Sequence, residues 1–329
     1  MARSKAQTKE KANIVTWPLY IILALAFILY IVYQRVQTLA ILFGVLTFVI
    51  LVILIGLEII ISSKEEGKLR NAIEIIAAIV IVVAIWFALR LILNTPYPID
   101  AVPSCSMLPV LQRGDMIVLQ GASPSNIKAP IVKVTSSEMQ KMLNNMNQES
   151  LECVAYGLNG GKINFSQEVL PGYSIGLTSI NGGGIVPNSS QSENLVKYLC
   201  GITNVTYSNG TEVNYAYTKA IIIGNTTITG DINNSIIVYK TVPQDLFYQE
   251  GDTYIVHRAY AIINASGTYY YLTKGDNNPG LDMQYDNYPA PQNDINGKVI
   301  GIIPYIGYLK LILSGELSQP AGCNYTFGK

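Results

Sequence analysis

Long uninterrupted apolar stretches dominate the first part of the chain and predict membrane-spanning helices. The first runs for 20 residues, from Ile14 to Tyr33, and the second for 19 residues, from Leu39 to Leu57. A third, Ala72 to Leu93, is charged only near its ends, at Glu74 and Arg90. At about 1.5 Å per residue, each stretch can cross a hydrocarbon layer of about 30 Å as a helix. Three such stretches in so short a segment are not expected of the core helices of a soluble protein.

Basic residues beside these stretches predict the topology of a membrane anchor at residues 1–97. Four precede the first span, at positions 3, 5, 9 and 11, one lies in the first connection, and three, at positions 64, 68 and 70, lie in the second. Because Lys and Arg accumulate on the cytoplasmic side, we expect the chain after Asn94 to lie outside. Since no small-residue cleavage site follows the first span, we interpret it as an anchor rather than a removed signal peptide. The sequence thus predicts a multi-pass protein of the cell membrane, embedded in the lipid bilayer, with its remaining part on the external face.

Beyond residue 97 the apolar pattern changes to short segments of β-branched and aromatic residues. Such segments are typical of strands, and the Asn-Gly and Asn-Pro-Gly sequences between them are typical of turns. The predicted strands are 99–102, 116–119, 236–239, 254–263, 268–272 and 298–303. Because helices do not alternate with these strands, we expect a mainly-β domain built from residues 98–127 and 231–329.

The segment 128–230 differs in composition from its flanks, and we expect it to be an inserted accessory domain. It is rich in Asn, Gly, Ser, Thr and Tyr, with one helix-like stretch near 136–147. Apolar stretches such as 220–223 recur through it, which argues against a disordered linker. Its composition suits a cap that shapes access, a carbohydrate-bearing shield or a docking surface, and does not choose among them.

Charge and cysteine content restrict the chemistry of the chain. Its 22 basic residues balance 22 acidic ones and form no basic run, so we expect no nucleic-acid partner. No Cys-x-x-Cys or Cys/His pattern suggests a metal site, and we expect neither a metal nor a cofactor. Cys153 and Cys200 lie in one segment and can pair in an oxidising compartment, but four cysteines allow three pairings. The sequence does not select one.

Eight Asn-x-Ser/Thr sequons lie in the part of the chain that is expected outside. They begin at residues 164, 188, 204, 209, 225, 233, 264 and 324. Their one-sided distribution agrees with an exterior domain that carries N-linked glycans.

The candidate chemistry begins at the heptapeptide Pro103 to Pro109, PSCSMLP, shortly after the last span. A serine can act as a nucleophile when a base lies within hydrogen-bond reach and donors await the oxyanion that forms. We assign Ser106 as the nucleophile, with Ser104 and the backbone N–H of Ser106 as oxyanion donors. A plain turn would use the same residue types, so the heptapeptide alone is a weak signal.

The chain contains one histidine, His257, which is the single imidazole available to such a serine. With an ordinary pKa of about 6.5, imidazole is suited to accept a proton from a serine near neutral pH. Asp276 and Asp282 follow in a loop rich in Gly and Pro, and either could orient the imidazole by accepting its second N–H. Turn formation by local hydrogen bonds is the alternative role for both.

Six short segments of the chain resemble, in their order, the sequence boxes of type I signal peptidases. They are PSCSMLP, RGD, SIIVYK, IVHR, LTKGDNN and GKVIGIIPYIG. The chain is most similar to the archaeal and endoplasmic-reticulum branch, in which histidine replaces the bacterial catalytic lysine. The resemblance covers about 99–125 and 231–313. It implies a mainly-β signal-peptidase catalytic domain after N-terminal transmembrane helices, with 128–230 as a large inserted segment. Cys105 stands where the family usually has glycine, and three spans depart from the usual one or two.

The resemblance implies a serine endopeptidase that removes signal peptides from exported preproteins. Its expected partners are these preproteins as they emerge from the translocation channel. By motif position Ser106 matches the nucleophile, His257 the general base and Ser104 the oxyanion-hole serine. Asp276 and Asp282 match the two aspartates that follow. Two alternatives remain: an anchored protease with a narrow regulatory substrate, and a non-catalytic glycosylated surface protein on the same scaffold.

Overall fold

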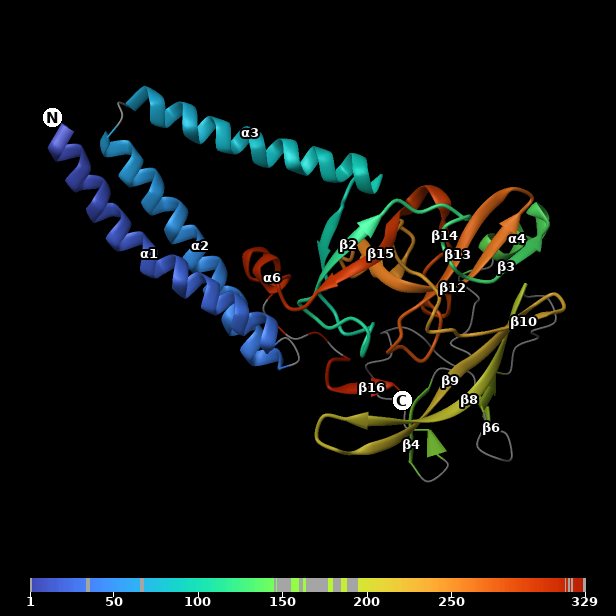
Figure 1. Ribbon diagram of the computed structural model, residues 1–329. Coiled ribbons are helices and arrows are strands. Elements are labelled where there is room, and N and C mark those ends of the chain that lie inside the picture. Colours follow the sequence, from blue (N-terminus) through green and yellow to red (C-terminus); the bar gives the residue numbers. More distant parts are fainter. Residues whose placement is uncertain are drawn as a thin grey trace. The chain divides into compact units, whose positions relative to one another are not determined.

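The computed structural model describes residues 2–33, 36–65, 68–144, 146, 155–159, 162–163, 177–179, 185–187, 195–316, 318, 320 and 322–327 (Figure 1). The chain divides into two compact units. The first comprises Met1–Pro103, Arg113–Val118 and Ile302–Leu317, and the second comprises Ser104–Gln112, Leu119–Gly301 and Ser318–Lys329. All five candidate site residues belong to the second unit.

The first unit contains the long helices α1 (Ala2–Val32), α2 (Gln37–Glu65) and α3 (Lys68–Leu93). Among the described residues, two helical segments are long and apolar enough to cross a membrane, Thr38–Leu57 and Ile76–Leu93. The predicted first span begins before the described side chains, and its described part, Trp17–Val32, is apolar but shorter. None of the Ile76–Leu93 segment is buried within the protein. An apolar helix surface without protein cover is what lipid contact requires, so the two helices indicate membrane anchoring.

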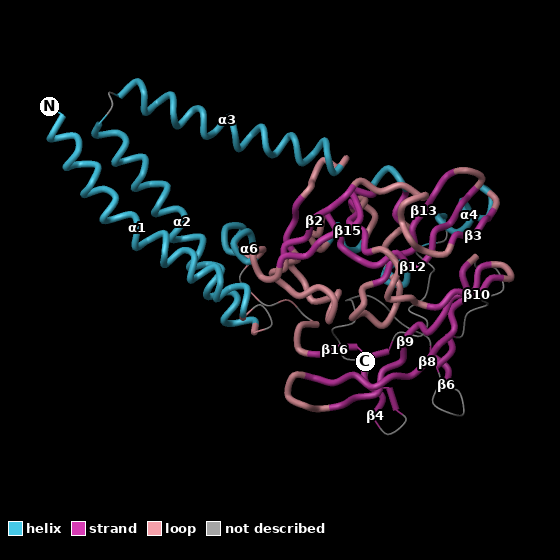
Figure 2. Tube along the Cα trace, in the orientation of Figure 1, coloured by secondary structure: helices cyan, strands magenta, loops and turns pink. Residues whose placement is uncertain are grey.

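Helices α1 and α2 lie side by side (Figures 1 and 2), and their contact is apolar. Ala26 of α1 packs with Ile50 and Leu54 of α2. Also in this unit, Tyr30 packs with Tyr305 and donates a hydrogen bond to the Pro304 carbonyl, just before the short helix α6 (Tyr308–Ser314). Strand β1 (Ile99–Ala101) pairs antiparallel with the first residues of β2 (Met116–Gln120). The first unit therefore combines packed helices with a short strand pairing.

The second unit is built on a sheet with the strand order β2, β15, β11, β12, β13 and β14. These further strands are β15 (Ile295–Ile303), β11 (Ile236–Lys240), β12 (Tyr254–Ala265), β13 (Thr268–Lys274) and β14 (Ala290–Pro291). Strands β11, β12 and β13 pair antiparallel. Every strand predicted in this part of the chain is present. The apolar helices followed by a mainly-β region confirm the predicted fold class.

One pairing in this sheet is parallel. Strand β3 (Ile131–Val134) lies parallel to β12, with Ile131 opposite Ile262. Parallel partners require a long connection rather than a hairpin, and here more than a hundred residues separate the two strands. Because β3 falls inside the predicted insertion, that segment supplies a strand to the main sheet.

Strand β12 is buried on both faces, since successive residues contribute to two separate apolar clusters. Ile255 and Ile262 pack with Ile237 and Tyr271 in one cluster, which also contains Tyr239. Tyr260, Ala261 and Ile263 belong to the other cluster. A register shift between Ala259 and Ala261 changes the alternation along the strand. The strand that carries His257 therefore runs through the centre of the unit.

A second sheet has the order β16, β8, β9, β4 and β5, and β10 also pairs with β9; all of its strands except the C-terminal β16 lie in the predicted insertion. Its strands are β4 (Ala155–Asn159), β5 (Lys162–Ile163), β8 (Val196–Tyr207), β9 (Glu212–Ile223), β10 (Thr226–Thr229) and β16 (Tyr325–Phe327), with a separate pair β6 (Leu177–Ser179) and β7 (Ile185–Pro187). The predicted helix near 136–147 is α4 (Ser136–Asn144), capped by reciprocal bonds between Thr135 and Glu138. The short elements of the main domain are α5 (Leu246–Gln249) and the 3₁₀ turns η3 (Asp282–Tyr285) and η4 (Gln292–Asp294).

Candidate active site

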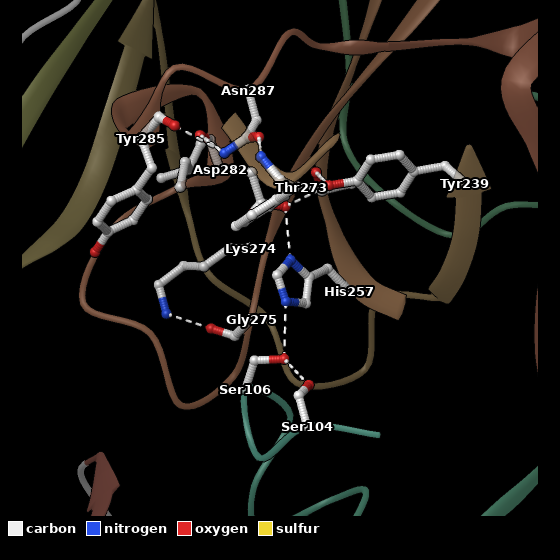
Figure 3. A network of polar contacts seen from close by, with 12 residues as sticks. Ser104, Ser106, Tyr239, His257, Thr273, Lys274, Gly275, Asp282, Tyr285 and Asn287 are labelled. Atoms are coloured by element: carbon white, nitrogen blue, oxygen red, sulfur yellow. Dashed lines mark hydrogen bonds and ion pairs between the residues drawn. The ribbon is translucent and has the colours of Figure 1, made fainter. Parts of the chain in front are cut away.

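Ser106 lies in a turn, and its side chain faces the imidazole of His257 (Figure 3). The distance from Ser106 Oγ to His257 Nε2 is 2.9 Å. The Ser104 hydroxyl lies on the other side of Ser106 Oγ, at 3.1 Å. The structure thus brings together three of the predicted site residues from positions 151 residues apart in the chain.

His257 is held in place by its strand and by an aromatic neighbour. It lies opposite Ile237 in the ladder between β12 and β11 and is 3% exposed. Phe247 meets its ring edge-on, with ring centroids 6.0 Å apart. Because burial and this contact restrict ring rotation, Nε2 stays directed toward Ser106.

Asp282 contacts the opposite side of the imidazole, with Oδ2 lying 2.7 Å from His257 Nδ1. The Tyr239 hydroxyl donates to the same Oδ2 at 3.0 Å, and the Thr273 hydroxyl lies 3.4 Å behind that of Tyr239 (Figure 3). Asp282 opens the η3 turn and is buried. Tyr239 and Thr273 were not among the predicted site residues. Their strands were predicted, but nothing local marks them as neighbours of a loop some 10 to 40 residues away.

The charge of Asp282 determines the direction of these hydrogen bonds. Burial by itself would raise the pKa of this carboxyl, but the positive charge of the imidazole when His257 is protonated and the hydrogen bonds from His257 and Tyr239 outweigh it, and the pKa is lowered. Burial and the Asp282 charge raise the pKa of Tyr239 well above its ordinary value, so Tyr239 remains a donor. An ionised Asp282 can only accept, which makes Nδ1 the protonated nitrogen of a neutral His257. Nε2 is then free to accept the Ser106 proton.

Asp276, the other predicted aspartate, lies against Arg258 rather than His257. Its two oxygens accept from Arg258 Nε at 2.7 Å and Nη2 at 2.6 Å. Arg258 Nη1 also donates to the carbonyls of Ile232 and Asn234, both at 2.6 Å. The two aspartates therefore have different partners, and the ion pair fixes the start of the loop beside the strand that carries His257.

The same loop contacts the backbone of the turn that carries the candidate nucleophile, Ser106. The Asn277 N–H donates to the Ser106 carbonyl at 2.7 Å, and Asn277 Nδ2 donates to the Cys105 carbonyl at 3.2 Å. Gly275 approaches so closely that an added Cβ would lie 2.7 Å from the Ser106 carbonyl oxygen. These two residues were quoted within a motif but had no predicted role.

Cys105 is joined to Cys323 by a disulfide. This pairing leaves Cys153 with Cys200 as the one compatible second bridge, but Cys153 and the Cys200 side chain lie outside the described residues. Spacing gave no signal for a bridge that spans 218 residues. A disulfide-bonded cysteine therefore stands at position 105, where the family that the sequence resembles usually has glycine.

Lys274 is the last residue of β13, directly before the loop, and its ammonium donates to the Gly275 carbonyl at 3.0 Å (Figure 3). Burial lowers the pKa of Lys274 to about 8, while Asp276 and Asp282 act in the opposite direction. Among the residues that the structure describes, no group of three or more His, Cys, Asp or Glu side chains could hold a metal ion.

Comparison with known proteins gives one informative similarity. The chain is 40% identical over 63 residues to the signal peptidase complex catalytic subunit of Colletotrichum graminicola. The aligned part is 18% of this chain and 37% of that protein, so the chain matches little more than a third of its relative. No known family model matches the chain. No solved structure matches it either. The predicted resemblance to the endoplasmic-reticulum and archaeal branch of type I signal peptidases is confirmed over this part.

Proposed function

We propose that this protein is a membrane-anchored serine endopeptidase that removes signal peptides from exported preproteins. The observation that carries the proposal is the line of contacts from Ser106 Oγ to His257 Nε2 at 2.9 Å and from His257 Nδ1 to Asp282 Oδ2 at 2.7 Å. This arrangement suits acyl transfer by a serine whose proton passes to an oriented imidazole. The partial similarity to a signal peptidase catalytic subunit supports the substrate class.

In the proposed reaction Ser106 Oγ attacks the scissile carbonyl while His257 Nε2 takes the hydroxyl proton. The positive charge that forms on the imidazole is stabilised by the ionised Asp282, which holds Nδ1–H. The Ser104 hydroxyl and the Ser106 backbone N–H are the proposed donors to the oxyanion, a contribution that can reach about 3–4 kcal/mol per donor. His257 then gives its proton to the leaving amine, and a water molecule, deprotonated by the same nitrogen, hydrolyses the acyl-enzyme.

The anchor explains why a signal peptide is a suitable substrate. A signal peptide has a short apolar stretch followed at once by small residues at the cleavage site, so its scissile bond lies near the membrane surface. Ser106 follows Leu93 by 13 residues, which even fully extended would reach about 45 Å. We place the catalytic domain on the external face of the cell membrane, in line with the distribution of basic residues. Confinement to the bilayer raises the effective concentration of enzyme and substrate.

The proposal is tested with purified full-length protein in proteoliposomes and a preprotein with a small-residue cleavage site. Mass spectrometry of the product should place the cut directly after the small residues. His257→Ala should lower the cleavage rate by at least about 10³-fold, because no other imidazole is available. Cleavage by His257→Ala at the wild-type rate, or no cleavage by the wild-type protein, would contradict the proposal.

A further inference from the structure

The C-terminal segment 322–327 contacts the nucleophile turn, although it lies outside the region of family resemblance. Cys323 is covalently bonded to Cys105, the residue before Ser106, with their Cα atoms 5.0 Å apart. The turn is thus attached on one side to a distant part of the chain. The disulfide is not the sole connection.

Asn277 joins this segment to the turn through its side chain. Its Nδ2 donates to the Cys105 carbonyl at 3.2 Å and lies 3.1 Å from the carbonyls of Gly322 and Tyr325. Its Oδ1 accepts from the Phe327 N–H at 2.6 Å. Asn277 is only 1% exposed, so these protein groups, rather than water, satisfy the hydrogen bonds of its side-chain amide. Movement of the C-terminal strand would therefore be transmitted to the residues beside Ser106.

The C-terminal strand is in turn held by the inserted sheet. Strand β16 pairs antiparallel with β8, with Phe327 opposite Val205 and Tyr325 opposite Tyr207. Phe327 and Val205 are buried together, and Tyr217 of β9 meets the Phe327 ring edge-on at 6.2 Å between centroids. The insertion is therefore linked to the nucleophile turn through β16.

A second link joins the insertion to the loop that carries Asp282. The Thr218 N–H of β9 donates to the Pro279 carbonyl at 2.9 Å, and its hydroxyl donates to Gln284 Oε1 at 2.8 Å. Gln284 belongs to the same 3₁₀ turn as Asp282 and also accepts from the Leu281 N–H at 2.8 Å. Thr218 is 2% exposed and Gln284 is 1% exposed. Losing the hydroxyl would leave a buried amide oxygen short of one partner.

We propose that the inserted sheet is a positioning element for the catalytic residues, and that Thr218 and the Cys105–Cys323 bridge are its two attachment points. This rests on the proposed function. One sheet holds the turn of Ser106 through β16 and the turn of Asp282 through β9, so it fixes the spacing of the two groups that flank His257. A displacement of about 1 Å in such an arrangement can cost about 10²-fold in rate. Because neither attachment point touches the substrate in this scheme, its loss should lower kcat and leave KM unchanged.

Thr218→Val keeps the side-chain shape and removes the hydroxyl, whereas Thr218→Ser keeps the hydroxyl. Thr229→Val, at an exposed position on β10 of the same sheet, is the matched control. We expect kcat to fall about 10-fold in Thr218→Val with an unchanged KM, and to be restored in Thr218→Ser. The double variant Cys105→Ser/Cys323→Ser should likewise lower kcat, and it decides the matter should Thr218→Val not fold.

His257, as the sole histidine, gives a second readout that does not depend on turnover. Labelling with [¹⁵N]histidine makes the Nδ1–H proton of His257 the one imidazole signal of the folded protein. We expect its chemical shift to change in Thr218→Val and to match the wild-type value in Thr229→Val. Wild-type kcat and an unchanged Nδ1–H signal in both Thr218→Val and the cysteine double variant would overturn the positioning role. If Ser106→Ala cleaves normally, the proposed function itself fails, which is a different result.

Discussion

The Asp276 carboxylate binds the Arg258 guanidinium through two parallel hydrogen bonds of 2.7 and 2.6 Å, one residue beyond His257 along β12. Both side chains are mostly buried, at 10% and 11% exposure. Their planar pairing and the two backbone carbonyls that Arg258 also binds satisfy most of the guanidinium donors. Asp276 thus secures the loop, while Asp282, six residues later, contacts the imidazole.

Replacing each aspartate by asparagine should separate these two parts. Asp282→Asn keeps the side-chain shape but presents an uncharged group to Nδ1, so we expect kcat to fall by about 10³–10⁴-fold with little change in melting temperature. Asp276→Asn should instead lower the free energy of unfolding by about 2 kcal/mol and affect kcat less, because it weakens a buried ion pair. Kinetics and thermal unfolding of both variants in detergent measure this. Equal losses of kcat would contradict the assignment.

Tyr239→Phe tests the contact behind Asp282. The substitution removes the hydroxyl that donates to Asp282 Oδ2 at 3.0 Å and leaves the ring in place. We expect kcat to fall about 10-fold at constant KM, because a hydrogen bond to a charged group contributes about 1.5–3 kcal/mol. Tyr271→Phe, on another strand of the same sheet, is the control. Because the Tyr271 hydroxyl bonds Gln292 instead, a similar effect of both substitutions would mean that losing a hydroxyl in this sheet, rather than the bond to Asp282, lowers kcat.

Gly275→Ala tests the approach of the loop to the turn that carries Ser106. The added Cβ would lie 2.7 Å from the Ser106 carbonyl oxygen, closer than such atoms can approach, so the loop or the turn must move. We expect a loss of activity of at least about 10²-fold, the cost of a misplacement near 1 Å. Gly56→Ala is the control, since nothing lies within 4 Å of its added Cβ. Wild-type activity of Gly275→Ala would show that the turn can shift without harm.

The pKa of Lys274, lowered to about 8 by burial, predicts a pH dependence of stability. In the unfolded chain lysine titrates near pH 10.4, so between about pH 8 and pH 10 the unfolded state holds a proton that the folded state has released. The free energy of unfolding gained from this group therefore rises with pH across that window. Lys274→Met should remove the rise, seen as a difference in melting temperature between wild type and variant that grows from pH 8 to pH 10. A constant difference would contradict the lowered pKa.

Much of the fold follows from local patterns in the sequence. Uncharged stretches of membrane length predicted the apolar helices, and β-branched segments predicted β11, β12 and β13, because these signals depend on neighbouring residues. The parallel pairing of β3 with β12 was not predicted, since the partner of a strand across a long connection leaves no local signal. The extent of the insertion is likewise a matter of tertiary packing: Thr218 and Tyr198 pack against parts of the main domain that a composition change does not reveal.

For the candidate site, chemistry was easier to predict than geometry. The two serines, the single histidine and the two aspartates were all named from residue type and motif order. The sequence did not show which aspartate contacts His257. Asp276 instead pairs with Arg258, and this contact is made only when the loop folds against β12. Tyr239, Asn277 and Cys323 act through contacts made by folding, at separations that spacing cannot indicate.

The most direct test of the central claim is the single-turnover cleavage rate of a preprotein by Ser106→Ala beside that of Ser104→Ala. The hydroxyl oxygens of the two serines lie 3.1 Å apart in the same turn, so Ser104→Ala shows how much activity is lost when the turn is disturbed but Ser106 remains. If Ser106 is the nucleophile, Ser106→Ala should lose at least about 10³-fold in rate, while Ser104→Ala, which removes one oxyanion donor, should lose about 10²-fold to 10³-fold. Cleavage by Ser106→Ala at the wild-type rate would contradict the account.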